Sequence, residues 1–471
     1  MSRPTNYDEF VSGKLAHAPP CGLASPPAPP PWLFPFQADL VTWALKRGRA
    51  AIFAGTGLGK TRMQLAWASA VATATGRRVL VLAPLAVARQ TVAEGAAVGV
   101  GVTLCREAED VRDGINVTNY DRLHRFDASA FGAVVLDESS CIKHHDTATL
   151  RLLLDAFAST PYRLACTATP APNDWTELGT HAEFLGVRSR AEMLAEFFTH
   201  DGGDTSEWRL KGHARRAFWA WVASWGALVS HPRDLGYEAA GYDLPPLRLL
   251  EHMLPSDHAE SQRAGYLFAR EASTLSERRT ARKVSIERRV EACASLVAAE
   301  PRETWIVWCD LNAESTALVE AIPGAVEVTG SMDADEKECR LVAFGEGRSR
   351  VLVTKPSICG FGLNWQHCAR VAFVGVTDSW EAYYQAVRRC WRFGQDRAVD
   401  VHVFASESEG SVVANLKRKD RDATELAAAL ASETGAAVRA EVRGVSRESN
   451  DYRPTETIRV PSWLRSEEVT T

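Results

Sequence analysis

The segment AAIFAGTGLGKT at residues 50–61 constrains this chain more than any other. The apolar run before its glycines predicts a buried strand, and residues 62–74 after it are rich in helix formers. A phosphate-binding loop requires this order of strand, glycine loop, Lys-Thr and helix. Backbone N–H groups can close around phosphate oxygens because glycine has no Cβ atom, and the helix directs the positive end of its dipole at the anion.

The loop predicts a site for a nucleoside triphosphate and a magnesium ion. Lys60 is expected to reach the β- and γ-phosphates, and the hydroxyl of Thr61 to coordinate Mg²⁺. Ala54 stands where the strict pattern has glycine, at a position that needs only a small residue. The alternative is an ordinary glycine turn, which the flanking strand and helix disfavour. The predicted contacts of the loop are Gly55, Thr56, Gly57, Gly59, Lys60 and Thr61.

Length and composition limit the class of protein. The 471 residues can form two large domains or three smaller ones. Because the net charge is −5, contacts with nucleic acid would depend on local basic patches. The ten cysteines include no C-x-x-C pair, which predicts a reducing cytosol and no zinc site. No apolar stretch of about 18 residues and no signal-peptide pattern occur, so we expect no membrane partner.

Strand and helix signals alternate in two parts of the chain. Near-continuous apolar strands with helical crossovers predict an α/β fold class with two parallel-sheet domains, because such strands are buried on both faces. The predicted boundaries are a Pro-rich lead-in at 1–31, a first domain at 32–246, a helical connector at 247–302, a second domain at 303–408, and a helix with a polar tail at 409–471. Residues 187–245 break the rhythm of the first domain and are predicted to be a Trp-rich insertion.

Two polar segments follow strands of the predicted first domain. Asp137 is expected to hold Mg²⁺, and Glu138 to orient and deprotonate the attacking water. A helix N-cap pair is the alternative, since aspartate is a good N-cap. The segment Thr167-Ala-Thr-Pro170 ends the next strand, and its hydroxyls can hydrogen-bond the Asp137 region. An ordinary Thr-Pro turn is the alternative there.

A third polar segment lies on a predicted helix of the second domain. It contains Gln385, Arg389 and Arg392, followed by Gly394 and Gln395. The two arginines are three residues apart and share a helix face, so both are candidate arginine fingers for the γ-phosphate. The alternative is a solvated arginine-rich helix, which the neighbouring Trp391 and Phe393 disfavour.

These segments occur in the order of the superfamily-two helicase core, and the chain most resembles the Swi/Snf-type branch over about residues 33–405. Residues 137–143 (DESSCIK) resemble its DEAH-x-(I/L)-K box, 167–173 (TATPAPN) its TGTPIQN motif, and 360–364 (GFGLN) its GGLGIN motif. Phe36-Gln37 resembles the upstream glutamine motif, and 118–121 (TNYD) looks like a motif along the nucleic-acid track. Gln395 is a further mark of this branch.

The resemblance implies two RecA-like domains with an ATP cleft between them, ATP hydrolysis, and movement along duplex DNA, often without strand separation. Gln37 would contact adenine, and Gly362 would join the nucleotide contacts. Contacts to the DNA backbone, independent of sequence, are expected from Pro84, Arg89, Thr118, Asn119, Lys355, Asn364 and Trp365. Residues 200–213 and 234–237 are similar to compact members encoded by phages and prophages, which predicts a cytoplasmic protein of a bacterium or a phage-infected host.

Several interpretations remain open at this point. The basic run at 278–289 is either a further DNA contact or a solvated helix. The tryptophans between 208 and 225 either stack on bases or form the small core of the insertion. The fragment Asp335-Glu-Lys337 is expected to begin a helix and not to form a nuclease site. For the whole chain, the alternatives to a DNA helicase or translocase are a nucleotide-gated nucleic-acid clamp and an RNA-directed helicase.

Overall fold

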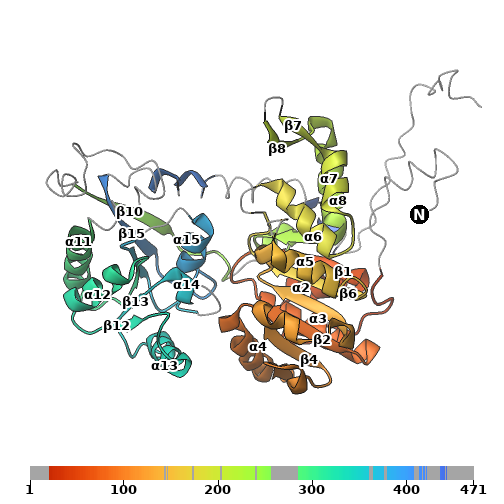
Figure 1. The fold of residues 1–471 in the computed structure, drawn as a ribbon, viewed down its shortest axis with the longest axis horizontal. Coiled ribbons are helices and arrows are strands. Elements are labelled where there is room, and N and C mark those ends of the chain that lie inside the picture. Colours follow the sequence, from red (N-terminus) through yellow and green to blue (C-terminus); the bar gives the residue numbers. More distant parts are fainter. Residues whose placement is uncertain are drawn as a thin grey trace, which may run out of the picture.

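The computed structural model describes residues 21–142, 145, 147–171, 174–201, 204–238, 241–255, 285–359, 364–375 and 379–407, together with 413–415, 417–419, 421, 435–436, 438–440 and 442. Two α/β domains lie side by side in Figure 1, each built on a parallel sheet. The predicted fold class of two tandem parallel-sheet domains is therefore confirmed.

The first domain is built on a sheet of seven strands in the order β3-β4-β2-β5-β6-β1-β9. All neighbouring strands in it pair in parallel, so their carboxyl ends share one edge. The strands are β1 (Arg49–Ala54), β2 (Arg78–Ala83), β3 (Val102–Leu104), β4 (Ile115–Asn119), β5 (Phe131–Asp137), β6 (Tyr162–Thr167) and β9 (Gly226–Val229).

Helices cover both faces of this sheet, because alternate residues of its strands point to opposite sides. Ile52 of β1 belongs to the core under one face and Phe53 to the core under the other. The first face packs against α2 (Pro35–Arg47), α3 (Lys60–Thr75) and α4 (Leu85–Ala97), and the second against α5 (Ala148–Ala156), α6 (Leu178–Phe184), α7 (Arg190–Phe197) and α8 (Arg215–Trp225).

The second domain has a parallel sheet of six strands in the order β10-β15-β14-β11-β13-β12. The strands are β10 (Leu247–Leu254), β11 (Trp305–Trp308), β12 (Ala325–Val328), β13 (Val351–Thr354), β14 (Arg370–Phe373) and β15 (Val399–Ser406). Its helices are α11 (Ile286–Ala299), α12 (Asn312–Ala321), α13 (Ala334–Gly345), α14 (Pro356–Cys359) and α15 (Trp380–Val387). The nuclease-like fragment at 335–337 lies in α13, as expected.

The predicted connector at 247–302 needs correction, because both of its described parts belong to the second domain. Strand β10 pairs along its whole length with β15, and α11 buries Val290 and Val297 in a core of that domain. A strand at the sheet edge with exposed Leu249 and Leu250 has no alternating apolar pattern to reveal it. The lead-in also becomes ordered before Trp32, since the backbone N–H of Leu23 bonds the carbonyl oxygen of Leu45.

The predicted insertion at 187–245 also needs correction. Trp219 and Trp225 of α8 are fully buried in a core of the first domain, and β9 is the edge strand beside β1. The antiparallel hairpin of β7 (Phe198–Asp201) and β8 (Asp204–Leu210) projects from the domain above α7 and α8 in Figure 1. The inserted part is thus this hairpin, and most of the tryptophans belong to the core.

Candidate active site

The glycine loop connects β1 to α3 in a backbone conformation that requires glycine at two positions. Gly57 has φ +89° and Gly59 φ +78°, a region that residues with a Cβ atom rarely adopt. Gly55 donates its N–H to the carbonyl of Val229, 2.9 Å away, which fixes the start of the loop against β9. Gly59 immediately precedes α3, so the loop lies at the positive end of a 16-residue helix.

Gln37 supports the loop from α2. Its Nε2 donates to the carbonyl oxygen of Leu58 over 2.8 Å, and its Oε1 accepts from the backbone N–H of Phe34 over 3.0 Å. A Cβ atom on Gly59 would lie 2.3 Å from this Nε2. The side chain of Gln37 is buried, so in this structure it positions the loop with both ends of its amide, whereas the resemblance predicts a contact with adenine.

Lys60, the first residue of α3, turns its ammonium group back toward the strand. Its Nζ donates to the carbonyl oxygen of Ala54 over 3.0 Å. The positive charge therefore lies above the loop, where it also acts electrostatically on Asp137. A neutral backbone carbonyl is a weaker partner for an ammonium group than a phosphate oxygen, so this contact can give way to an anion in the loop.

Asp137 ends β5 and faces the loop from a buried position. Its Oδ1 accepts from Nε2 of Gln64 at 2.7 Å and from the N–H of Glu138 at 3.1 Å. The pKa of Asp137 is raised to about 6, first by burial and then by the charge of Glu138, while the hydrogen bond from Gln64 and the charge of Lys60 act in the opposite direction. The site therefore holds more buried negative charge than Lys60 offsets.

Glu138 has φ +50° and is the only non-glycine residue with positive φ in the described ranges. Strained backbone of this kind gathers at functional sites. One carboxylate oxygen of Glu138 accepts from the hydroxyl of Thr167 over 3.4 Å, and that hydroxyl also accepts from the N–H of Thr169 over 3.1 Å. The hydroxyl contact that the sequence predicts between the TATP segment and the carboxylate pair is thus present, at Glu138.

Arg392 lies in the segment of the second domain that contacts the glycine loop. Burial lowers the pKa of Arg392, while the negative charges of Glu94 and Glu138 act to raise it. Its Nη1 donates to Oδ1 of Asn364, which holds the guanidinium from within its own domain. Phe393, the next residue, lies against the glycine loop, since a Cβ atom on Gly57 would be 2.9 Å from its backbone nitrogen. The phosphate loop and the arginine segment therefore meet.

The other predicted residues of this segment lie inside the second domain. Gln385 on α15 and Arg389 are both buried, and the backbone carbonyl of Arg389 accepts the N–H of Trp365 over 2.9 Å. Arg388 stacks over the ring of Trp391 at 4.2 Å. Of the two arginines predicted as fingers, Arg392 is the one next to Phe393, which contacts the glycine loop. Gly362 lies outside the described residues.

Most of the predicted nucleic-acid contacts lie at the carboxyl ends of strands. Ala83 pairs with Asn119 between β2 and β4, which brings Pro84, Thr118 and Asn119 to one edge. Thr118 and Asn119 are buried, Arg89 is exposed, and Lys355 follows β13 in the second domain. Asn364 is exposed beside Arg392.

Trp365 does not fit the prediction of a nucleic-acid contact. Its indole is buried and packs against Phe344, with ring centroids 5.2 Å apart, and against Trp308 at 6.2 Å. The large apolar surface of the ring stabilises the core of the second domain. A motif fixes which residue stands at a position, but the direction of its side chain depends on packing that the motif does not contain.

The residues present fit a nucleoside triphosphate with a divalent cation. The loop has left-handed glycines directly before the start of α3, and the excess of buried carboxylate charge at Asp137 and Glu138 is what a hard cation would offset. Thr61 and Asp137 would hold the cation, whose chemistry is to polarise phosphate oxygens. Lys60 would hold the terminal phosphates.

Three residues of the site escaped the sequence analysis. Gln64 lies one turn after Lys60 on α3, a spacing that could have suggested a second polar contact from the same helix face. Tyr120 donates its hydroxyl to the carbonyl of Asp137 at 2.7 Å. His181 contacts the hydroxyl of Ser139 at 3.1 Å, and burial lowers its pKa to about 4, so it is neutral. The last two contacts join distant parts of the chain and leave no local pattern.

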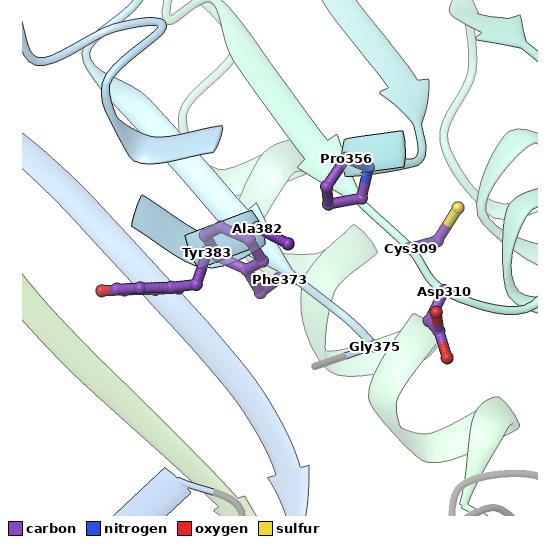
Figure 2. Close-up of a pocket in the computed structure, with 7 residues that line it drawn as sticks. All are labelled: Cys309, Asp310, Pro356, Phe373, Gly375, Ala382 and Tyr383. Carbon is purple, nitrogen blue, oxygen red and sulfur yellow. The ribbon is translucent and has the colours of Figure 1, made fainter. Parts of the chain in front are cut away.

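A second cavity is too small for a nucleotide. Figure 2 shows it in the second domain, near the ends of β11, β13 and β14. Its volume is about 20 Å³, which is room for about one water molecule. It is lined by Cys309, Asp310, Pro356, Phe373, Gly375, Ala382 and Tyr383. Within the ranges described above, no helix is long and apolar enough to cross a membrane.

The glycine loop and the carboxylate pair thus lie on one parallel-sheet domain, and the arginine segment of the second domain contacts the loop through Phe393. Residues 288–394, in the second domain, match the model of the helicase conserved C-terminal domain. No curated protein matches. Among solved structures, the chain is similar to the SWI2/SNF2 ATPase core of Sulfolobus solfataricus in complex with dsDNA, with 17% identity, 88% of this chain and 96% of that chain covered, and a TM-score of 0.42.

Proposed function

We propose that this protein is a DNA-stimulated ATPase of the Swi/Snf type. It is a translocase that moves along DNA as its two domains close on ATP and open after hydrolysis. The observation that supports the proposal is that Phe393, the residue after Arg392 in the second domain, lies against Gly57 of the phosphate loop in the first. Hydrolysis that needs groups from both domains couples turnover to domain movement.

The side chains divide the chemistry among them. Lys60 neutralises charge on the terminal phosphates, and Glu138 takes a proton from the attacking water, held in place by Thr167. Arg392 stabilises the negative charge that develops on the transferred phosphoryl group. Gln64 and Tyr120 hold Asp137 and its backbone in position from two sides. The resemblance assigns ATP as the nucleotide, Mg²⁺ as its cation and duplex DNA as the track.

Steady-state ATP turnover with duplex DNA, single-stranded DNA and RNA tests this proposal. We expect duplex DNA to stimulate the wild type most, and Lys60→Ala and Glu138→Gln to abolish turnover while both variants keep the wild-type circular dichroism spectrum. Glu138→Gln should still bind ATP, since Lys60 and the loop are unchanged. Undiminished turnover in Glu138→Gln would overturn the mechanism, and stimulation by RNA alone would replace DNA by RNA as the track.

A clamp that uses hydrolysis only for release is the second candidate, because the same loop, carboxylates and arginine would serve it. Displacement of a triplex-forming strand from duplex DNA separates the two. A translocase displaces the strand in an ATP-dependent reaction that lags in proportion to the distance from the entry site. A clamp leaves the triplex intact at any ATP concentration.

A further inference from the structure

A run of basic residues extends from the end of β8 to the start of α8, outside the active site. Residues 209–216 (RLKGHARR) contain five basic side chains and no acidic one, in a chain whose net charge is −5. We call this set the basic ridge, and its members are Arg209, Lys211, His213, Arg215 and Arg216. Arg209, His213, Arg215 and Arg216 are exposed.

The ridge is available for an anion. Within the part of the chain that the structure describes, Arg209 and Arg216 have no ion-pair or hydrogen-bond partner for their side chains. Lys211 has a structural role, because its Nζ donates to the carbonyls of Ala195 and Glu196, both at 2.9 Å, and so fixes the hairpin to the end of α7. Unpaired arginines on a fixed base can bind phosphates with little loss of conformational freedom.

The hairpin presents a stacked aromatic pair next to this charge. His200 and Trp208 face each other across β7 and β8 in register, with ring centroids 3.9 Å apart. His200 is exposed and Trp208 is half-buried, unlike Trp219 and Trp225 of the core. An aromatic face at the rim of a basic surface suits a nucleic-acid base, since every base can stack and the neighbouring phosphates meet arginine.

The position of the ridge connects it with the active site. Strand β9 pairs with β1, and α8, which leads into β9, starts at Arg215. Arg215 at that start lies over the ring of Trp175 at 5.7 Å, and Trp175 lies just beyond the segment whose Thr167 contacts Glu138. Arg215 of the ridge therefore lies beside the segment that follows β6, a strand of the same parallel sheet as β2 and β4, whose ends carry the predicted DNA contacts Pro84, Thr118 and Asn119.

We propose that the basic ridge and the His200–Trp208 pair form a second DNA contact, in which the arginines hold backbone phosphates and the aromatic pair stacks on an unpaired base where duplex meets single strand. This rests on the proposed function, because it takes DNA as the substrate. In sequence the hairpin contains Asp201, Asp204 and Glu207, so the phosphates follow the basic ridge and not the acidic part of the hairpin.

The charge is tested by the Arg209→Glu/Arg216→Glu variant in DNA binding measured over a range of salt concentrations. Its matched control is Arg106→Glu/Arg151→Glu, which reverses two exposed arginines of the same domain outside the ridge. We expect the ridge variant to bind DNA more weakly and its log-log salt dependence to become shallower by about 1.8, the value for two lost phosphate contacts. The control should keep the wild-type slope. An unchanged slope in the ridge variant overturns the proposal.

The stacking is tested by Trp208→Ala with a blunt duplex and with the same duplex carrying a single-stranded tail. We expect a loss of about 5- to 150-fold in affinity for the tailed DNA and no change for the blunt duplex, with Trp208→Phe restoring most of the loss. Equal losses on both substrates would overturn the base contact, because a merely structural defect does not distinguish them. The melting temperature of each variant shows whether the variant has a folding defect. If Trp208→Ala has one, Trp208→Phe still tests the stacking, because it keeps an aromatic ring at this position.

Two further outcomes have distinct meanings. If the ridge variant keeps its DNA affinity but loses binding of polyglutamate, the surface is a site for an acidic protein and the DNA contact is overturned. If the wild type itself binds no DNA and its ATPase is not stimulated by DNA, that result overturns the proposed function, whatever the ridge variants show. Intact duplex-stimulated turnover in Trp208→Ala, with weakened binding of tailed DNA, supports both.

Discussion

Gly57 of the phosphate loop packs directly against Phe393 of the second domain, where a Cβ atom on the glycine would lie 2.9 Å from the backbone nitrogen of Phe393. The same glycine has φ +89°. The two domains thus touch at the turn of the loop, one residue away from Arg392. A conformational change in the loop can therefore move Arg392, which the proposed hydrolysis needs, directly through the contact with Phe393.

Gly57→Ala is expected to lower ATP turnover about ten- to a hundredfold. The substitution combines backbone strain of about 1–3 kcal/mol at positive φ with a steric conflict across the domain contact. Gly99→Ala is the matched control, since Gly99 has φ +74° and nothing within 4 Å of its Cβ position. The control should lose a similar amount of stability and keep its turnover. Equal turnover in both variants would show that the domain contact does not matter to hydrolysis.

Arg392→Ala is expected to lower kcat about 10³- to 10⁵-fold with little change in ATP binding, as for an arginine that stabilises only the transition state. Arg388→Ala is the control on the same turn. Its guanidinium stacks on Trp391 and Tyr384, so its loss should cost stability more than turnover. The measurement is single-turnover hydrolysis with DNA in excess. A larger loss of kcat in Arg388→Ala than in Arg392→Ala would assign the finger to Arg388.

The first half of the site could be predicted because its signals are local. The glycines, Lys60 and the following helix stand within one short segment, and Asp137 directly follows an apolar run. Parallel strands bring their carboxyl ends to one edge, so the meeting of these segments also follows from the fold class.

The rest of the architecture depends on contacts between distant residues. Residues of β10 form a strand because they pair with β15, whose residues lie 152 positions away in sequence, as in the pair Arg248 and Asp400. Trp365 became a core residue through Phe344 and Trp308. A short segment of sequence does not contain these distant partners. A local pattern can therefore contain a tryptophan or a short apolar run, but it does not predict which surface of the protein will pack against it.

The stability of the nucleotide-free protein should depend on the ionisation of Asp137. Burial raises its pKa from 3.8 to about 6, so the native state binds more protons than the unfolded state between these values. The free energy of unfolding therefore falls as the pH rises through this window. Asp137→Asn keeps an acceptor for Gln64 and removes the charge. We expect its gain in stability over the wild type to grow from pH 4 to pH 6 and to level off at about 3 kcal/mol.

Urea denaturation from pH 4 to pH 8, without nucleotide or metal, measures this difference. Asp113→Asn is the control, because the Asp113 side chain is 94% exposed, and it should show little dependence on pH relative to the wild type. A gain that is constant across the whole range would contradict the assignment to Asp137. Asp137→Asn should also lose ATP turnover, which would show that this buried charge is retained for function at the expense of stability.

The buried ion pair between Arg289 and Glu314 should be sensitive to loss of either charge. Both side chains are fully buried, with Nη1 2.8 Å from Oε1, so Arg289 is neither the DNA contact nor the solvated residue that the basic run at 278–289 suggests. Glu314→Gln leaves the guanidinium unpaired in the core and should cost about 3–5 kcal/mol in unfolding free energy. The added Arg289→Met substitution removes that charge and should recover part of the loss.

A double-mutant cycle measured by urea denaturation gives the coupling free energy between Arg289 and Glu314. The surface control is the pair Glu346→Gln and Arg348→Met, in which both side chains are more than half exposed. That pair should contribute under about 1 kcal/mol. A cost for Glu314→Gln as small as that of the control would contradict a buried pair. Because Arg289 holds α11 to α12 and does not reach the surface, Arg289→Met should also leave the salt dependence of DNA binding unchanged. In this respect it should differ from the substitutions of Arg209 and Arg216, whose charge faces solvent.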